Sequence, residues 1–143
     1  LLLGAGAATA KPKPKIDVAA VEIASSATQG KEGDKRLARS IRRLAHQAAK
    51  GLDFGKGGPA VLTLTVRELK VVEEDGVLRV TCTIVGTLKG GGSAKSRLSF
   101  GGKPNQKKKL MQQVVGSVTE GVVTRLSMLS REKRKAAEAA PES

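Results

Sequence analysis

The chain has 143 residues, a length that suits one domain. It contains no Trp, no Tyr and only two Phe, which excludes an aromatic-rich core and requires one built from Val, Leu, Ile and Ala. The formal net charge of +13 favours anionic partners such as nucleic acid, lipid head groups or acidic polymers, and it does not choose among them.

Residues 1–10 are largely apolar and end in Ala8-Thr9-Ala10, after which Lys and Pro alternate. A short apolar run that ends in an A-x-A pattern is typical of a secretory signal peptide next to its cleavage site. We therefore predict a signal-peptide remnant over residues 1–10, an extended Lys/Pro linker over residues 11–15, and a periplasmic or secreted location. The alternative for the first segment is a linker of small residues or a disordered tail.

Residues 16–23 are dominated by β-branched side chains and predict the first strand. Their apolar side chains fall on both faces, which suits a strand inside a sheet. Residues 34–50 predict the first helix, with Asp34 as its N-terminal cap and Gly51 just past its end. The helix has one apolar stripe, made of Leu37, Ile41, Leu44, Ala45 and Ala48.

The other face of this helix is basic and includes Arg36, Arg39, Arg42 and Arg43. No acidic residue interrupts this face, so intrahelical ion pairs cannot neutralise the arginines. We therefore predict that these four side chains form an anion-binding surface.

Residues 60–72 alternate between apolar and polar, but the phase slips between Arg67 and Glu68. One extra residue at that point, a β-bulge, would return all the apolar side chains to one face. Asp75-Gly76 is a strong signal for a two-residue hairpin turn. Counting outward from this turn with one bulged residue predicts the cross-strand pairs Val71–Val80, Leu69–Cys82, Val66–Ile84 and Leu62–Leu88.

Residues 94–100 alternate again and predict a fourth strand. A second long helix is predicted from Asn105 to residue 130, where apolar residues recur at helical spacing. Gly116 and Gly121 lie inside it and cost about 1 kcal/mol each relative to Ala, so we predict that both allow close packing against the sheet. Residues 131–143 predict a charged, partly disordered tail, in which residues up to 140 either extend the helix into solvent or fray. One domain is then predicted over residues 16–130.

The predicted order is β-α-β-β-β-α, with one apolar stripe on each helix and one strongly apolar sheet face. A two-layer α+β fold buries all three surfaces: a four-stranded, mostly antiparallel sheet with two helices on one face.

A second candidate anion site lies where the second helix begins, at Gly102, Lys103, Lys107, Lys108 and Lys109. Free backbone N–H groups and the helix dipole favour an anion at a helix N-terminus, and the lysines add to that field. The plainer interpretation is a simple loop followed by solvated lysines.

No residue pattern in the sequence indicates catalysis. His46 is the only histidine and has no Cys partner for a zinc site. Cys82 is the only cysteine, which excludes an intramolecular disulfide, and it is predicted to fill the core. Residues 73–75 are acidic but lack the spacing of a calcium loop, so they predict a solvated turn. We predict a non-enzyme without cofactor or metal.

These features favour an exported, non-enzymatic binding or scaffold protein whose basic surface engages an anionic envelope component. The candidates are lipopolysaccharide, anionic lipid and an acidic partner protein. The alternative is a basic nucleic-acid-binding protein, because phosphate contacts need only Lys and Arg. The scarcity of aromatic side chains argues against that alternative, because single-strand and RNA-binding modules generally stack bases on such side chains.

Overall fold

The computed structural model describes residues 14–139 and confirms the predicted α+β order. The strands are β1 (Ile16–Ile23), β2 (Ala60–Glu74), β3 (Val77–Leu88) and β4 (Ser93–Gly102), and the helices are α2 (Lys31–Ala49) and α3 (Lys107–Ala139). Short 3-10 turns cover Ser25–Ala27 and Pro104–Gln106. The predicted signal remnant lies outside the described residues. Neither helix among residues 14–139 has the length and apolarity needed to cross a membrane.

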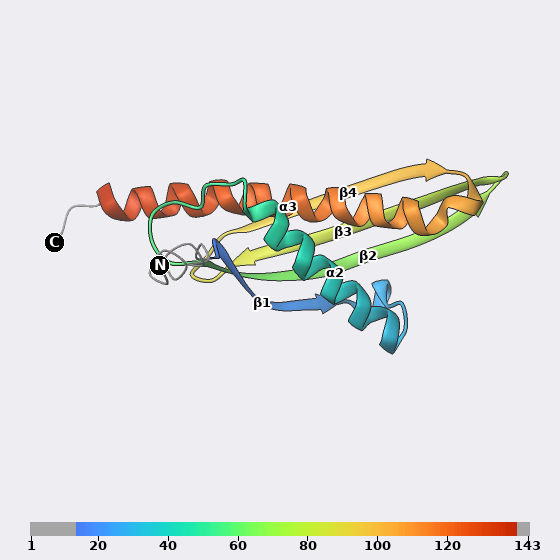
Figure 1. Ribbon diagram of the computed structural model, residues 1–143, viewed down its shortest axis with the longest axis horizontal. Coiled ribbons are helices and arrows are strands. Elements are labelled where there is room, and N and C mark those ends of the chain that lie inside the picture. Colours follow the sequence, from blue (N-terminus) through green and yellow to red (C-terminus); the bar gives the residue numbers. More distant parts are fainter. Residues whose placement is uncertain (1–13, 140–143) are drawn as a thin grey trace, which may run out of the picture.

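The four strands form one mixed sheet in the order β1-β2-β3-β4. β1 runs parallel to β2, and the other two neighbouring pairs are antiparallel. In Figure 1, α3 runs along β3 and β4 while α2 crosses obliquely near β1. The two helices also contact each other, so a single apolar core lies between them and one face of the sheet. The opposite face of the sheet has no covering layer among residues 14–139.

The β2–β3 hairpin has the register that the alternation and the turn predict. All four predicted pairs are present, and the register shifts between Val66 and Glu68, which makes Arg67 the bulged residue. Asp75 and Gly76 have φ values of 53° and 76°, the positive values that a tight two-residue hairpin turn requires. The bulge therefore keeps Leu62, Leu64 and Val66 on the same buried face as Leu69.

The position predicted for the first strand is wrong, because β1 lies at an edge of the sheet and pairs only with β2. Its apolar side chains do not face opposite sides. The register with β2 shifts between Val18 and Ala20, so Ala19 is an extra residue. This second bulge places Ile16 and Val18 on the same face as Val21 and Ile23, toward the core.

The start of the first helix is also corrected, because α2 begins three residues before Asp34, at Lys31, and has Gly30 at its N-cap. Asp34 lies in the first turn of α2 and does not cap the helix. Its side chain binds the segment that precedes the helix. Its carboxylate accepts hydrogen bonds from Thr28 Oγ1 and from the backbone N–H of Gln29, both at 2.6 Å. The helix ends at Ala49, just before Gly51 as predicted.

The prediction for the two glycines of α3 is right for Gly121 and wrong for Gly116. A Cβ atom at Gly121 would lie 3.0 Å from Ser96 Oγ on β4, so the missing side chain allows the helix to approach the sheet. A Cβ atom at Gly116 would have no neighbour within 4 Å. The helix continues through residues 131–139, which the sequence pattern assigns to the tail.

The uncovered face of the sheet carries the two ion pairs found among residues 14–139, both made by Glu68. Its carboxylate accepts hydrogen bonds from Thr83 Oγ1 at 3.0 Å and Arg97 Nε at 3.1 Å, and lies 3.3 Å from Lys70 Nζ. The hydrogen bond from Thr83, then that from Arg97, lowers the pKa of Glu68 below its usual value.

A lowered pKa in the folded protein means that ionised Glu68 adds stability at neutral pH, and that this stability is lost as the pH falls through the folded pKa. We expect Glu68→Gln to make the free energy of unfolding fall less steeply between about pH 5 and pH 3. Urea unfolding at a series of pH values measures this slope. Glu120→Gln removes an exposed carboxylate of α3 that forms no ion pair with the described residues. An equal change of slope in both variants would contradict the role of Glu68.

Candidate binding groove between the two helices

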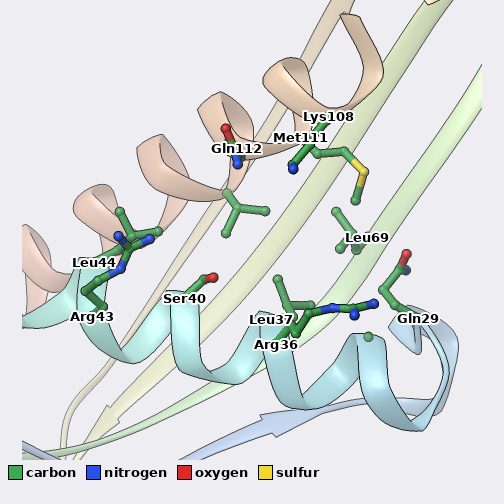
Figure 2. Close-up of a pocket in the computed structure, with 12 residues that line it drawn as sticks. Gln29, Arg36, Leu37, Ser40, Arg43, Leu44, Leu69, Lys108, Met111 and Gln112 are labelled. Carbon is green, nitrogen blue, oxygen red and sulfur yellow. The ribbon is translucent and has the colours of Figure 1, made fainter.

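A groove of about 700 Å³ lies between α2 and α3 and is open to solvent (Figure 2). Three segments that are distant in the sequence form it: α2 with the turn before it, one residue of β2, and the first half of α3. Its lining consists of Gln29, Gly33, Arg36, Leu37, Ser40, Arg43, Leu44, Leu69, Lys108, Met111, Gln112 and Val115.

The apolar part of the lining is continuous with the core. Leu69 of β2 and Val115 of α3 are buried, whereas Leu37, Leu44 and Met111 pack against the core and remain partly exposed. These five side chains are called the groove floor below. In Figure 2, Leu37, Leu69 and Met111 point toward one another across the space between the helices. The floor therefore leaves apolar surface in contact with water, which a bound apolar group would cover.

Three cationic side chains line the same groove. Arg36 and Arg43 come from α2, and Lys108 comes from α3 on the other side (Figure 2). No Asp or Glu is among the lining residues, and none of the three cations forms an ion pair with residues 14–139. The three are called the cationic rim below. Their charges are thus available to an anionic ligand, and Ser40, Gln29 and Gln112 add hydrogen-bonding groups.

The structure separates the four arginines predicted as one surface. Arg36 and Arg43 line the groove, whereas Arg39 is exposed on α2 away from it. The guanidinium of Arg42 donates a hydrogen bond to the backbone carbonyl of Val18, which ties α2 to the edge strand β1. The separation follows from helical spacing, because residues seven apart return to nearly the same side of a helix while Arg39 and Arg42 are rotated away from it.

The second predicted site is divided in the same way. Only Lys108 lines the groove, while Lys103, Lys107 and Lys109 are exposed where α3 begins. Gly102 ends β4 and is half-buried, and a Cβ atom there would lie 3.4 Å from Leu110 Cδ2. Lys108 is therefore the one residue of this group that shares a surface with the arginines of α2.

Gly33 allows the turn before α2 to close one end of the groove. A Cβ atom at Gly33 would lie 2.9 Å from Gln29 Cβ, closer than real side chains approach. The missing side chain lets the segment before α2 fold against the first turn of the helix. Gln29 is held there by its side-chain amide, which donates to the backbone carbonyl of Ala27 at 3.0 Å.

The groups considered for catalysis lie apart from this groove. Cys82 is fully buried, as predicted, and burial, followed by the charge of Glu68, raises its pKa to about 12. The thiol is therefore protonated at neutral pH and is not an available nucleophile. His46 is half-buried on α2. Among residues 14–139, no three His, Cys, Asp or Glu side chains lie close enough together to hold a metal ion.

No protein-family model and no curated protein matches this sequence. Several solved structures are similar to it in backbone. A protein of Caulobacter crescentus CB15 that has been proposed to be a lipoprotein is 14% identical, with a TM-score of 0.48, over 80% of this chain and 90% of its own. A variant of PelC from Paraburkholderia phytofirmans, a dodecamer, is 12% identical, with a TM-score of 0.49, over 82% of this chain and 96% of its own.

A minor lipoprotein from Acinetobacter baumannii is 9% identical, with a TM-score of 0.35, over 80% of this chain and 92% of its own. All three identities are 14% or less, and all three TM-scores are below 0.5. These similarities therefore transfer no function to this chain, and the groove has to be interpreted from its own residues.

Proposed function

We propose that this protein is a non-enzymatic binding module whose groove between α2 and α3 receives an anionic ligand of the cell envelope. The observation that supports this proposal is the cationic rim. Arg36, Arg43 and Lys108 line one groove whose lining contains no carboxylate, and none of the three forms an ion pair with residues 14–139. A ligand that carries phosphate or carboxylate would neutralise these charges through charge-assisted hydrogen bonds.

The proposed location rests on the sequence alone. The small-residue pattern Ala8-Thr9-Ala10 is typical of a secretory signal, and it lies outside the described residues. An envelope protein with a cationic groove would meet lipids and glycolipids with negatively charged head groups. The basic net charge would increase the local concentration of such ligands at the protein surface.

The test compares two double variants that remove the same charge from α2. Arg36→Gln with Arg43→Gln removes both rim arginines, and Lys35→Gln with Arg39→Gln removes two exposed cations outside the groove. Binding is measured by cosedimentation with vesicles that contain phosphatidylglycerol, and phosphatidylcholine vesicles serve as the uncharged reference. We expect the first double variant to bind the anionic vesicles about tenfold more weakly.

The second double variant should change this affinity by about twofold or less, because its charges contribute only to the general field. Equal losses in the two variants would show that net charge, and not the groove, drives binding. Tight, salt-sensitive binding of single-stranded DNA that neither double variant alters would instead favour a nucleic-acid-binding protein.

A further inference from the structure

We infer that the ligand of the groove is an acyl-chain amphiphile with an anionic head group, whose chain lies on the groove floor. This inference rests on the proposed function and specifies the chemical class of its ligand. The juxtaposition that supports it is a set of partly exposed apolar side chains that share one groove with three cations, none of which forms an ion pair with the described part of the chain.

The floor distinguishes this site from a simple anion site. An inorganic anion would need only the rim, and it would leave Leu37, Leu44 and Met111 in contact with water. An alkyl chain would cover these side chains and would extend the core contacts of Leu69 and Val115. The floor therefore adds to the affinity of a ligand only if the ligand carries an apolar part.

The size and polarity of the groove agree with one such chain. A volume of about 700 Å³ lies within the range of roughly 300–1,000 Å³ that is usual for small-molecule sites. The lining contains three cations, three neutral polar side chains and no acidic side chain. A ligand with its charge at one end therefore finds cations on both sides of the groove and an apolar surface between them.

The experiment uses a series of alkyl phosphates: methyl, hexyl, octyl and decyl phosphate, each below its micelle concentration. Isothermal titration calorimetry suits a chain without Trp or Tyr, because intrinsic fluorescence would report little. We expect affinity to increase roughly two- to fourfold for each methylene that reaches the floor. Methyl phosphate should bind most weakly, because only the rim contacts it.

Two variants separate the floor from the rim. Met111→Gln places a polar group of similar size on the floor and should reduce the gain per methylene without abolishing the binding of methyl phosphate. Met128→Gln is the matched control, because Met128 lies on the same helix, is 48% exposed and does not line the groove. Arg36→Gln should weaken all four ligands by a similar factor and leave the gain per methylene unchanged.

Equal affinities of methyl and decyl phosphate would overturn the acyl-chain inference and leave the anion-binding function intact. A gain per methylene that Met111→Gln and Met128→Gln reduce equally would also overturn it, since the chain would then lie elsewhere. If an acidic amphipathic helix of about twelve residues binds in a Met111-dependent manner while decyl phosphate shows no gain, the groove docks a protein helix and the inference is wrong. If neither phosphates nor anionic vesicles bind, the proposed function fails as well.

Discussion

Replacing Gly86 with valine is expected to lower the free energy of unfolding by about 3 kcal/mol. Gly86 lies on β3, opposite Leu64 of β2 and Ala94 of β4, where Val122 and Leu126 of α3 pack against the sheet. A Cβ atom there would lie 2.6 Å from Val122 Cγ1 and 2.6 Å from Leu126 Cδ1. Both side chains are fully buried, so α3 would have to move away from the sheet.

Gly116→Ala provides the control for this prediction. Gly116 lies within α3, where an added Cβ atom meets nothing within 4 Å. Alanine there should raise the free energy of unfolding by up to about 1 kcal/mol through helix propensity alone. Urea unfolding of the two variants should therefore shift in opposite directions. If the free energy of unfolding changed in the same direction in both variants, the backbone freedom of glycine, and not close packing, would account for the effect at Gly86.

A double-mutant cycle would identify the contact itself. Gly86→Ala and Leu126→Ala each remove stability, the first by crowding and the second by leaving a cavity. Leu126→Ala also removes one of the two atoms that would lie 2.6 Å from the new Cβ atom. The combined cost should therefore be smaller than the sum of the two single costs. Strict additivity would contradict the geometry described for Gly86.

The hairpin shows how much of the fold local sequence can determine. Asp75-Gly76 fixes the turn, and alternation on both sides then allows only one register that keeps the apolar residues together. The bulge at Arg67 follows from that constraint, because the phase of β2 slips while that of β3 does not. Two strands joined by a short turn therefore determine each other.

The first strand shows where this reasoning stops. β1 pairs with β2 in parallel, across a connection that contains α2, so no short turn fixes its register. Without a fixed register, Ile16 and Val18 on one phase and Val21 and Ile23 on the other look like a strand with two apolar faces. The bulge at Ala19 becomes evident only when the partner strand is known.

The groove could be predicted only in part, because it too depends on how segments distant in the sequence are placed relative to each other. The sequence identifies the cations of α2 and of the start of α3, and it assigns Leu37 and Leu44 to the apolar stripe of the first helix. Which cations share a surface depends on how the two helices cross, and this is set by contacts between residues about seventy positions apart. Helical spacing alone cannot show that Lys108 faces Arg36 and Arg43 while Lys107 and Lys109 do not.

Replacing Arg134 with alanine is expected to lower the free energy of unfolding by about 2 kcal/mol. The guanidinium of Arg134 donates hydrogen bonds to the backbone carbonyls of Gly55 at 3.1 Å, Lys56 at 3.4 Å and Gly58 at 2.7 Å. One turn earlier, Ser130 Oγ donates to the carbonyl of Phe54 at 2.8 Å. The last turns of α3 thus hold the connection between α2 and β2, which a solvated tail would not do.

The loop that connects α2 to β2 offers a local measurement of the stability that Arg134 contributes. Lys56 lies within it, so trypsin cleavage there reports how often the loop leaves the helix. If opening is governed by Arg134, a change of about 2 kcal/mol corresponds to roughly thirtyfold faster cleavage. Lys135→Ala removes a neighbouring exposed cation of α3 and should leave both stability and cleavage nearly unchanged.

Arg134→Lys should have an intermediate stability at best, because a single ammonium cannot reach three carbonyls in the geometry of a guanidinium. If Arg134→Ala behaves like Lys135→Ala, the hydrogen bonds of Arg134 contribute nothing to the stability of the domain.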